Sequence, residues 1–378
     1  MKIVLISEDY PPTSGGIAQW AYGIVKELVL MGHDVTVLSR ENVFRLEEFT
    51  YNGERIVKMN SKKWSQFRSV YIAYYTLKEV IKTKPDLIIA STWNIGAFAT
   101  SIKRFFGFKT VLAYHGLEVT KNLSPKRRFK LIRALKNSDV NIAVSRFTKN
   151  EICKKYTVPT DWVSVIHNGV DLARFKPEPK SPALLGKHNL NDEHILLTLS
   201  RVIERKGHDV VLRALPEVIK SFPKFKYIIA GVYDQNFYKT LTLLITELCL
   251  EDHVIITGVV PSEEILDYYN LCDAYIMVSK GSGTNGDSEG FGITYLEANA
   301  CEKPVIASET DGIPDAVEHG VNGLLVPPNN VEETSKAILS FLNDPERAKS
   351  IGKQGLKRIH QKFTWKKITE HILASINE

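Results

Sequence analysis

The first 170 residues alternate short aliphatic and β-branched runs with longer amphipathic stretches. Short apolar runs are typical of buried strands in a parallel sheet, whereas apolar residues recurring every three or four positions predict helices. The predicted helices are about 17–31, 68–83 and 125–137. The predicted strands are 3–7, 34–39, 55–59, 86–91, 110–116, 141–145 and 162–169. This alternation predicts a parallel, doubly wound α/β sheet.

A second set of the same kind follows a break at residues 171–191. Prolines recur from Lys176 to Pro182, too often for a helix or a strand. The strands predicted beyond it are 195–202, 227–231, 254–258, 274–279, 304–308 and 323–327, and the helices include 207–221, 331–343, 345–361 and 364–377. We therefore predict two Rossmann-like domains, 1–170 and 192–363, joined by a linker at 171–191. Ligands of such sheets bind outside the carboxyl ends of the strands, so we expect the site in an interdomain cleft.

The net charge of +6 is unevenly distributed along the chain. Residues 1–170 hold 26 Lys and Arg against 14 Asp and Glu, a net charge of +12, which leaves −6 for the remainder. A basic half of this size attracts anionic partners such as lipid headgroups or phosphorylated carriers, although a solvated basic surface explains the same charge. No nucleic-acid-binding module accompanies it, which argues against nucleic acid as the partner.

Cysteine usage and hydropathy indicate a cytoplasmic protein. The four cysteines have no C-x-x-C spacing, so they indicate neither a disulfide framework nor a zinc site, and we interpret them as buried thiols. The apolar run at the start is too short for a signal sequence. No window of roughly 18 uninterrupted apolar residues indicates a membrane span.

The sequence GDSEGFGITYLEA at 286–298 places two carboxylates around a glycine-rich helix start. Gly290 and Gly292 lack side chains there, so the backbone N–H groups of 291–293 can approach a phosphate at the positive end of the helix. Glu289 and Glu297 then suit hydroxyl groups on either side of that phosphate. A nucleotide diphosphate sugar fits this layout, whereas the structural alternative makes Glu289 a helix-start charge and Glu297 a surface residue.

A diphosphate also needs cations, which the sequence SRVIERKG at 200–207 supplies after a strand. We expect Arg201 and Lys206 to face the site and stabilise the leaving diphosphate, and Arg205 to face solvent. The chain has no D-x-D pair to hold Mg²⁺ or Mn²⁺. We therefore predict catalysis without a metal or other cofactor.

Two features of the first half point toward the same ligand. Gly15 and Gly16 follow the first strand without a G-x-G-x-x-G fingerprint, which argues against a dinucleotide-dependent oxidoreductase. Paired glycines there form a simple tight turn in many proteins, but they would also let the backbone of the first domain close onto a phosphate held by the second. His115 follows another strand and so lies at its carboxyl end, although a histidine at a strand end can be purely structural.

Taken together, these motifs resemble the family 4 retaining glycosyltransferases of the GT-B fold over essentially the whole chain. The resemblance is carried by E-x7-E at 289–297, S-R-x4-K-G at 200–207, G-G-I at 15–17, A-Y-H-G-x-E at 113–118, V-S-R at 144–146 and N-G-V-D at 168–171.

The resemblance also implies a role for each site residue. Arg201 and Lys206 would bind the diphosphate, and Gly16 would approach it from the first domain. Glu289 would bind the transferred sugar and Glu297 the ribose. Backbone groups of Gly290, Phe291, Gly292 and Ile293 would meet the phosphate, Val260 would meet the base, and His115 would lie beside the reaction centre. The resemblance further implies that the last helix, 364–378, packs back on the first domain.

For the acceptor, the helix at 125–137 places Lys126, Lys130 and Arg133 on one face. The segment 61–68 mixes cations with aromatic residues, as interfacial segments do. Both features favour an anionic membrane surface or a lipid-linked acceptor, contacted from the cytoplasmic side.

The resulting prediction is a retaining, metal-independent hexosyltransferase that extends a glycolipid or a cell-surface oligosaccharide such as lipopolysaccharide. The glycine-rich loop resembles that of lipid-acceptor mannosyltransferases, which favours GDP-mannose as donor. UDP-glucose, UDP-galactose and UDP-N-acetylglucosamine stay open, as does a non-catalytic sugar-nucleotide-binding protein.

Overall fold

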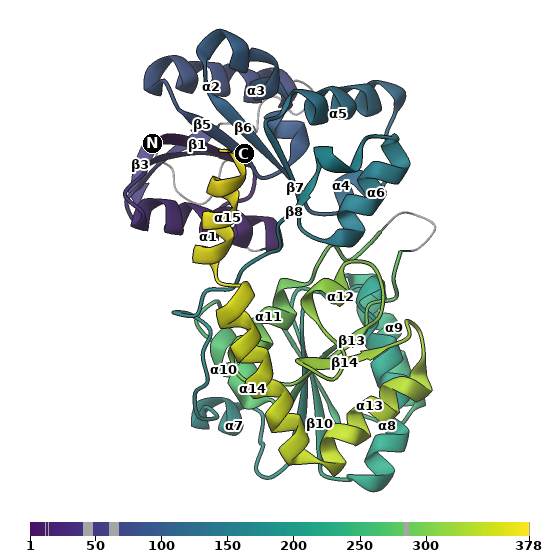
Figure 1. Cartoon of the computed structure of the whole chain (residues 1–378). Coiled ribbons are helices and arrows are strands. Elements are labelled where there is room, and N and C mark those ends of the chain that lie inside the picture. Colours follow the sequence, from purple (N-terminus) through teal and green to yellow (C-terminus); the bar gives the residue numbers. More distant parts are fainter. Residues whose placement is uncertain (12, 14, 41–47, 60–67, 283–286, 378) are drawn as a thin grey trace. The chain divides into compact units, whose positions relative to one another are not determined.

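The computed structural model describes residues 1–11, 13, 15–40, 48–59, 68–282 and 287–377. The chain forms two compact units, one made of Met1–Gly169 with Trp365–Glu378 and the other of Val170–Thr364 (Figure 1). Each unit is an α/β sandwich built on its own sheet.

The first unit has the strand order β3-β4-β2-β1-β5-β6-β7-β8, and neighbouring strands are parallel except β3 and β4. The strands are β1 (Lys2–Ser7), β2 (Asp34–Arg40), β3 (Glu48–Tyr51), β4 (Glu54–Met59), β5 (Leu87–Ala90), β6 (Lys109–Tyr114), β7 (Val140–Ala143) and β8 (Ser164–Val165). The helices are α1 (Gly16–Leu30), α2 (Arg68–Thr83), α3 (Trp93–Phe106), α4 (Leu117–Thr120), α5 (Pro125–Asn137), α6 (Arg146–Tyr156) and α15 (Trp365–Ser375), with a 3₁₀ turn, η2 (Thr160–Trp162).

Alternation along the strands divides the core of this unit into two layers. Ile3 and Leu5 of β1 pack toward α1 and α15, whereas Val4 and Ile6 pack toward α2, α3 and α5. Successive side chains of a strand point to opposite faces, so a run of consecutive apolar residues is needed to bury both faces.

The edge of the first sheet differs from the prediction of parallel strands alone. β3 pairs antiparallel with β4 through a turn at Asn52 and Gly53, both with positive φ. An Asn-Gly pair favours such a tight hairpin, so the sequence carried a signal for β3 that the apolar pattern did not show. The strand predicted at 162–169 is short, because only Ser164–Val165 pair with β7.

The second unit is a six-stranded parallel sheet in the order β11-β10-β9-β12-β13-β14. The strands are β9 (His194–Leu199), β10 (Phe225–Ala230), β11 (Val254–Gly258), β12 (Ala274–Met277), β13 (Val305–Ser308) and β14 (Gly323–Val326). The helices are α7 (Pro182–Lys187), α8 (His208–Ser221), α9 (Gln235–Glu247), α10 (Ile265–Leu271), α11 (Ile293–Ala300), α12 (Ile313–Ala316), α13 (Val331–Asn343) and α14 (Pro345–Lys362), with a 3₁₀ turn, η3 (Glu204–Lys206). Figure 1 shows α8, α9 and α13 on one face of this sheet and α10, α11 and α14 on the other.

The proline-rich segment belongs to the second unit. It is irregular up to Ser181, and α7 begins at Pro182, where a proline without an N–H costs a helix nothing. Hydrogen bonds with Asn270 fix it, since Glu178 N–H donates to Asn270 Oδ1 (2.8 Å) and Asn270 Nδ2 donates to Lys176 O (3.1 Å).

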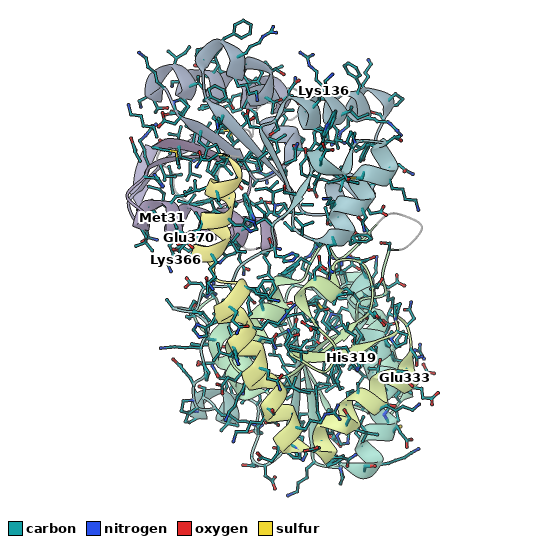
Figure 2. The ribbon with its side chains drawn as sticks, viewed as in Figure 1. Met31, Lys136, His319, Glu333, Lys366 and Glu370 are labelled. Carbon is teal, nitrogen blue, oxygen red and sulfur yellow. The ribbon has the colours of Figure 1, made fainter. Side chains whose placement is uncertain are left out.

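The final helix α15 lies along α1 within the first unit. Figure 2 labels Lys366 and Glu370 on α15 and Met31 just after α1. The ring of Trp365 lies against Gly23 of α1 and against Gly169, where any β-carbon would collide with the indole. Two glycines therefore make room for one tryptophan.

One prediction about the cysteines was wrong. Cys272 and Cys301 are buried and Cys153 is half-buried, but Cys249 is exposed. Cys249 has φ +53 in the turn that ends α9. Turns at helix ends lie at the surface, which explains why Cys249 is exposed.

Candidate functional site

The cationic turn of the second unit follows β9. Arg201 is exposed, whereas Arg205 is only 12% exposed and Lys206 10%. The turn ends at Gly207, whose φ is +73 and where a β-carbon would collide with Val278 O at the end of β12. Glycine is therefore required for η3 to pack against the carboxyl end of β12.

Glu289 lies opposite this turn and forms two buried ion pairs. Its Oε2 accepts hydrogen bonds from Lys206 Nζ (2.5 Å) and Arg205 Nη1 (2.7 Å). Burial alone would raise the pKa of Glu289, but the charges of Lys206 and Arg205 and their hydrogen bonds lower it to about 2. Burial lowers the pKa of Lys206, and Glu289 opposes that change.

The prediction that Arg205 faces solvent is therefore wrong. The 3₁₀ geometry of η3 turns its guanidinium inward, where Glu289 offsets the cost of burial. The structure thus brings together two residues predicted for the site, Lys206 and Glu289, and adds Arg205 to them.

The helix predicted after Glu289 is confirmed as α11. Gly292 caps it with φ +91, and a β-carbon on Gly292 would collide with the ring of Tyr295. Phe291 is buried and its ring packs against Phe363. It therefore presents its backbone, and not its side chain, at the start of the helix. Gly290, Phe291, Gly292 and Ile293 form the N-terminal approach to α11, where backbone N–H groups favour an anion.

Glu297 of α11 is buried, which rules out the alternative that it is a surface residue. Only 2% of it is exposed, and its Oε2 accepts a hydrogen bond from Tyr269 Oη (2.6 Å). Burial, followed by the charge of Glu297, raises the pKa of Tyr269 well above its ordinary value. Tyr269 carries no local sequence signal of this role, because its partner is 28 residues away.

A polar chain also lies buried beneath Arg201. His208 Nδ1 lies 3.3 Å from Tyr227 Oη, which lies 2.8 Å from Thr198 Oγ1, and His208 Nε2 lies 3.5 Å from Arg201 O. Burial lowers the pKa of His208 to about 4, so the imidazole is neutral at pH 7. Val260 follows β11 and is half-buried, next to the exposed Val259.

In the first unit, α1 and β6 bring Gly16 and His115 into one region. Trp20, one turn after Gly16, packs edge-on against His115, with ring centroids 5.5 Å apart. His115 Nε2 donates to Ser91 O (2.8 Å), since a carbonyl only accepts. Burial lowers the pKa of His115 to about 4, although the bond to Ser91 opposes this, so the ring is neutral at pH 7.

Comparison with known proteins decides the family. Residues 181–358 match the family model for glycosyl transferases group 1, and residues 14–174 match the model for Glycosyltransferase Family 4. The chain is 30% identical over 370 residues to a GDP-mannose-dependent alpha-(1-6)-phosphatidylinositol monomannoside mannosyltransferase of Mycolicibacterium smegmatis, covering 96% of this chain and 95% of the relative. The chain belongs to glycosyltransferase family 4.

Solved structures agree with this family at the level of the fold. Sucrose-phosphate synthase of Thermosynechococcus elongatus matches with a TM-score of 0.82 and 23% identity, covering 99% of this chain and 97% of that one. HepE of Anabaena, solved in complex with UDP and glucose, matches with a TM-score of 0.77 and 21% identity over the full length of both chains. The glycosyltransferase therefore has the predicted GT-B fold.

Two motifs of the resemblance have structural roles in this glycosyltransferase. Ser145, from V-S-R, caps α6 by accepting a hydrogen bond from Thr148 N–H (3.1 Å). Gly169, from N-G-V-D, makes room for Trp365.

The basic helix predicted for the acceptor is α5. Leu131 and Leu135 face the core as expected, and Lys126 and Arg133 are exposed. Lys130 is half-buried, and burial followed by the charge of Arg127 lowers its pKa. Of the segment 61–68, residues 61–67 lie outside the described part of the chain, and Arg68 forms an ion pair with Glu8.

Within the described residues, the glycosyltransferase has no helix long and apolar enough to cross a bilayer. The same residues contain no group of three or more His, Cys, Asp or Glu side chains arranged to hold a metal ion. Metal-independent catalysis stays a prediction.

Proposed function

We propose that this glycosyltransferase moves a hexose from a nucleotide sugar, with GDP-mannose as the favoured donor, to a lipid-linked acceptor. The observation that supports it is the cluster of Arg205, Lys206 and Glu289 beside the N-terminus of α11. Cations, backbone amides and a hydroxyl-binding carboxylate are the groups a nucleoside diphosphate sugar requires. The Mycolicibacterium smegmatis relative, named for GDP-mannose, favours that donor over UDP-sugars.

Glu289 forms an ion pair with Lys206, so donor binding must redistribute these charges. The incoming diphosphate attracts Arg201 and Lys206, while Arg205 keeps its bond to Glu289. Arg205 thereby leaves the carboxylate ionised and free to accept hydroxyl groups of the sugar through its other oxygen. Glu297 takes the ribose hydroxyls, the backbone at Val260 meets the base, and Gly16 and His115 of the first unit keep their predicted roles.

The proposed reaction retains configuration at the anomeric carbon. The bond from that carbon to the diphosphate oxygen breaks, the acceptor oxygen bonds on the same face, and the departing diphosphate takes the acceptor's proton. Negative charge develops on the diphosphate, so Arg201 and Lys206 stabilise the transition state more than the bound donor. A Lys206→Ala variant should lose roughly 100-fold or more in kcat. Lys220→Ala is the control, because Lys220 is 72% exposed and pairs with its helix neighbour Glu217.

The first experiment is calorimetric titration of GDP-mannose and three UDP-sugars, of glucose, galactose and N-acetylglucosamine, with EDTA present. Micromolar binding of GDP-mannose, weakened in Glu297→Ala, supports the donor proposal and metal-independent binding. Selective binding of a UDP-sugar replaces GDP-mannose by that donor. Failure of all four donors refutes the donor proposal and leaves a rarer nucleotide sugar or a site that has lost its activity. Proton NMR of the transferred sugar then tests retention, and an inverted product refutes it.

We also propose that α5 brings the enzyme to an anionic membrane surface through Lys126, Lys130 and Arg133. Replacing all three by glutamate should abolish sedimentation with vesicles that contain anionic phospholipid. The control replaces Lys349, Lys353 and Lys357 by glutamate, and it should leave sedimentation unchanged. These three lysines are exposed and similarly spaced on α14. Equal sedimentation of the α5 variant and the wild type would refute membrane binding through α5.

A further inference from the structure

The turn after β13 is joined to Glu289 by two hydrogen bonds and to Ser282 by a third. Glu289 N–H donates to Asp311 Oδ2 (2.9 Å), and Gly312 N–H donates to Glu289 O (3.0 Å). Ser282 Oγ donates to the other carboxylate oxygen, Asp311 Oδ1 (2.6 Å). Both backbone groups of Glu289 are thus satisfied by two consecutive residues of one turn.

Asp311 holds this position in a backbone conformation that favours glycine. Its φ is +53, in the left-handed region, and the following Gly312 has a negative φ. Glycine adopts that conformation more easily than aspartate, so the backbone alone gives no reason for a side chain here. The carboxylate supplies the reason, because it accepts the N–H of Glu289 and the hydroxyl of Ser282.

The two residues that Asp311 holds lie on either side of residues 283–286, which are outside the described part of the chain. Ser282 comes before them and Glu289 after them. The chain also passes close to the turn at Gly281, where a β-carbon would lie 2.7 Å from Thr310 Oγ1. Asp311 therefore ties Ser282 and Glu289 to the turn that follows the buried strand β13.

We propose that Asp311 is a positioning residue that fixes the backbone of Glu289, so that its side chain meets Arg205 and Lys206 and reaches the donor sugar. This rests on the proposed function, because the carboxylate of Glu289 matters only if a donor binds there. Asp311 itself makes no contact with substrate in this proposal. Its carboxylate is already engaged by Glu289 and Ser282, and it acts through them.

The test compares Asp311→Gly, Asp311→Asn and Ser282→Ala in the full-length enzyme. Asp311→Gly suits the left-handed backbone yet removes the carboxylate bonds to Glu289 and Ser282, so it separates positioning from backbone strain. Asp311→Asn keeps one acceptor oxygen, and Ser282→Ala removes only the second bond. Asn189→Gly is the matched control, since Asn189 also has positive φ (+51) in the second unit, in the turn after α7.

Two measurements are made on each variant. Hydrogen exchange by mass spectrometry follows the peptide that contains Glu289 and needs no substrate. Steady-state kinetics with the donor identified by calorimetry give kcat and KM. A displacement of about 1 Å at a reacting group can reduce the rate roughly 100-fold. We expect Asp311→Gly to exchange at least 10-fold faster at this peptide and to lose at least 10-fold in kcat/KM, mainly through kcat. Asp311→Asn should be intermediate, and Asn189→Gly should match the wild type.

The outcomes separate this proposal from the proposed function. Asp311→Gly with wild-type exchange, or with kinetics within about 2-fold of wild type, would overturn the positioning role even if the enzyme is an active transferase. Loss of activity equal in Asp311→Gly and Asn189→Gly would overturn it too, because any change of backbone freedom would then suffice. If the wild type transfers no sugar, the proposed function fails, and the positioning role in catalysis falls with it. Accelerated exchange in Asp311→Gly would then still confirm the contact between Asp311 and Glu289.

Discussion

Replacing Glu289 by glutamine removes the carboxylate that pairs with both Arg205 and Lys206, and it leaves two cations side by side at 10–12% exposure. Breaking a buried ion pair by removing one partner costs about 3–5 kcal/mol. A second estimate comes from the carboxylate, since lowering its pKa from 4.5 to about 2 corresponds to about 3 kcal/mol. Both estimates predict that the second unit of Glu289→Gln loses about 3 kcal/mol of unfolding free energy at pH 7. The thermal midpoint should fall by about 6–12 °C.

The positions of the tryptophans allow each unit to be followed separately. All five (Trp20, Trp64, Trp93, Trp162 and Trp365) belong to the first unit. In urea unfolding, tryptophan fluorescence therefore follows the first unit, while far-UV circular dichroism follows both. Glu289→Gln should move the dichroism transition of the second unit to lower urea concentration and leave the fluorescence transition of the first unit unchanged.

The matched control is Glu204→Gln, whose side chain is 77% exposed and lies 3.4 Å from Lys280. An exposed pair of this kind contributes about 0–1 kcal/mol. The double variant Glu289→Gln with Lys206→Met should recover much of the loss, because one unpaired cation is gone. If Glu289→Gln is within about 1 kcal/mol of Glu204→Gln, the buried cluster is not what stabilises this turn.

The pH dependence has a defined sign. Because the folded pKa of Glu289 is below its unfolded value, its contribution is present above about pH 4.5 and is lost as the pH falls toward 2. Glu289→Gln should therefore be less sensitive to pH than the wild type over this range. An unchanged pH profile in the variant would contradict the lowered pKa.

Further predictions concern His115, Tyr269 and Trp365. The pKa of His115 is lowered from 6.5 to about 4, so the stability of the first unit should fall as the pH decreases from 6.5 toward 4, and His115→Asn should flatten this dependence of the fluorescence midpoint. Tyr269→Phe leaves the buried Glu297 without its phenol donor and should lower the unfolding free energy by about 1–3 kcal/mol in urea unfolding followed by dichroism, whereas a neutral effect would contradict the bond. Trp365→Ala should cost about 3–5 kcal/mol and expose α15 to hydrogen exchange, and unchanged exchange in α15 would show that the indole does not hold it.

The sequence determined the elements because each depends on local pattern. Apolar runs of the right length gave the strands of both sheets except β3, and amphipathic periodicity gave helices such as α13 and α14 nearly to the residue. The start of α11 after Glu289 could also be predicted, since the positive φ at its N-cap position favours a glycine, and Gly292 stands there. Local sequence further identified Lys206 and Glu289 as candidates, because glycines and charges at fixed spacing mark an anion site.

Tertiary structure decided which side chains meet. Arg205 looked solvent-facing in its own segment, and its partner Glu289 lies 84 residues later. Tyr269 and Asp311 carry no local sign of function, because each is defined by a bond to a residue more than twenty positions away. Burial set the neutral state of His115, whereas the cations Arg205 and Lys206 overcame the effect of burial and set the ionised state of Glu289. Only the folded chain brings these groups together. The sequence by itself therefore determined the elements and the candidate chemistry, while the packing of distant segments decided how that chemistry is arranged.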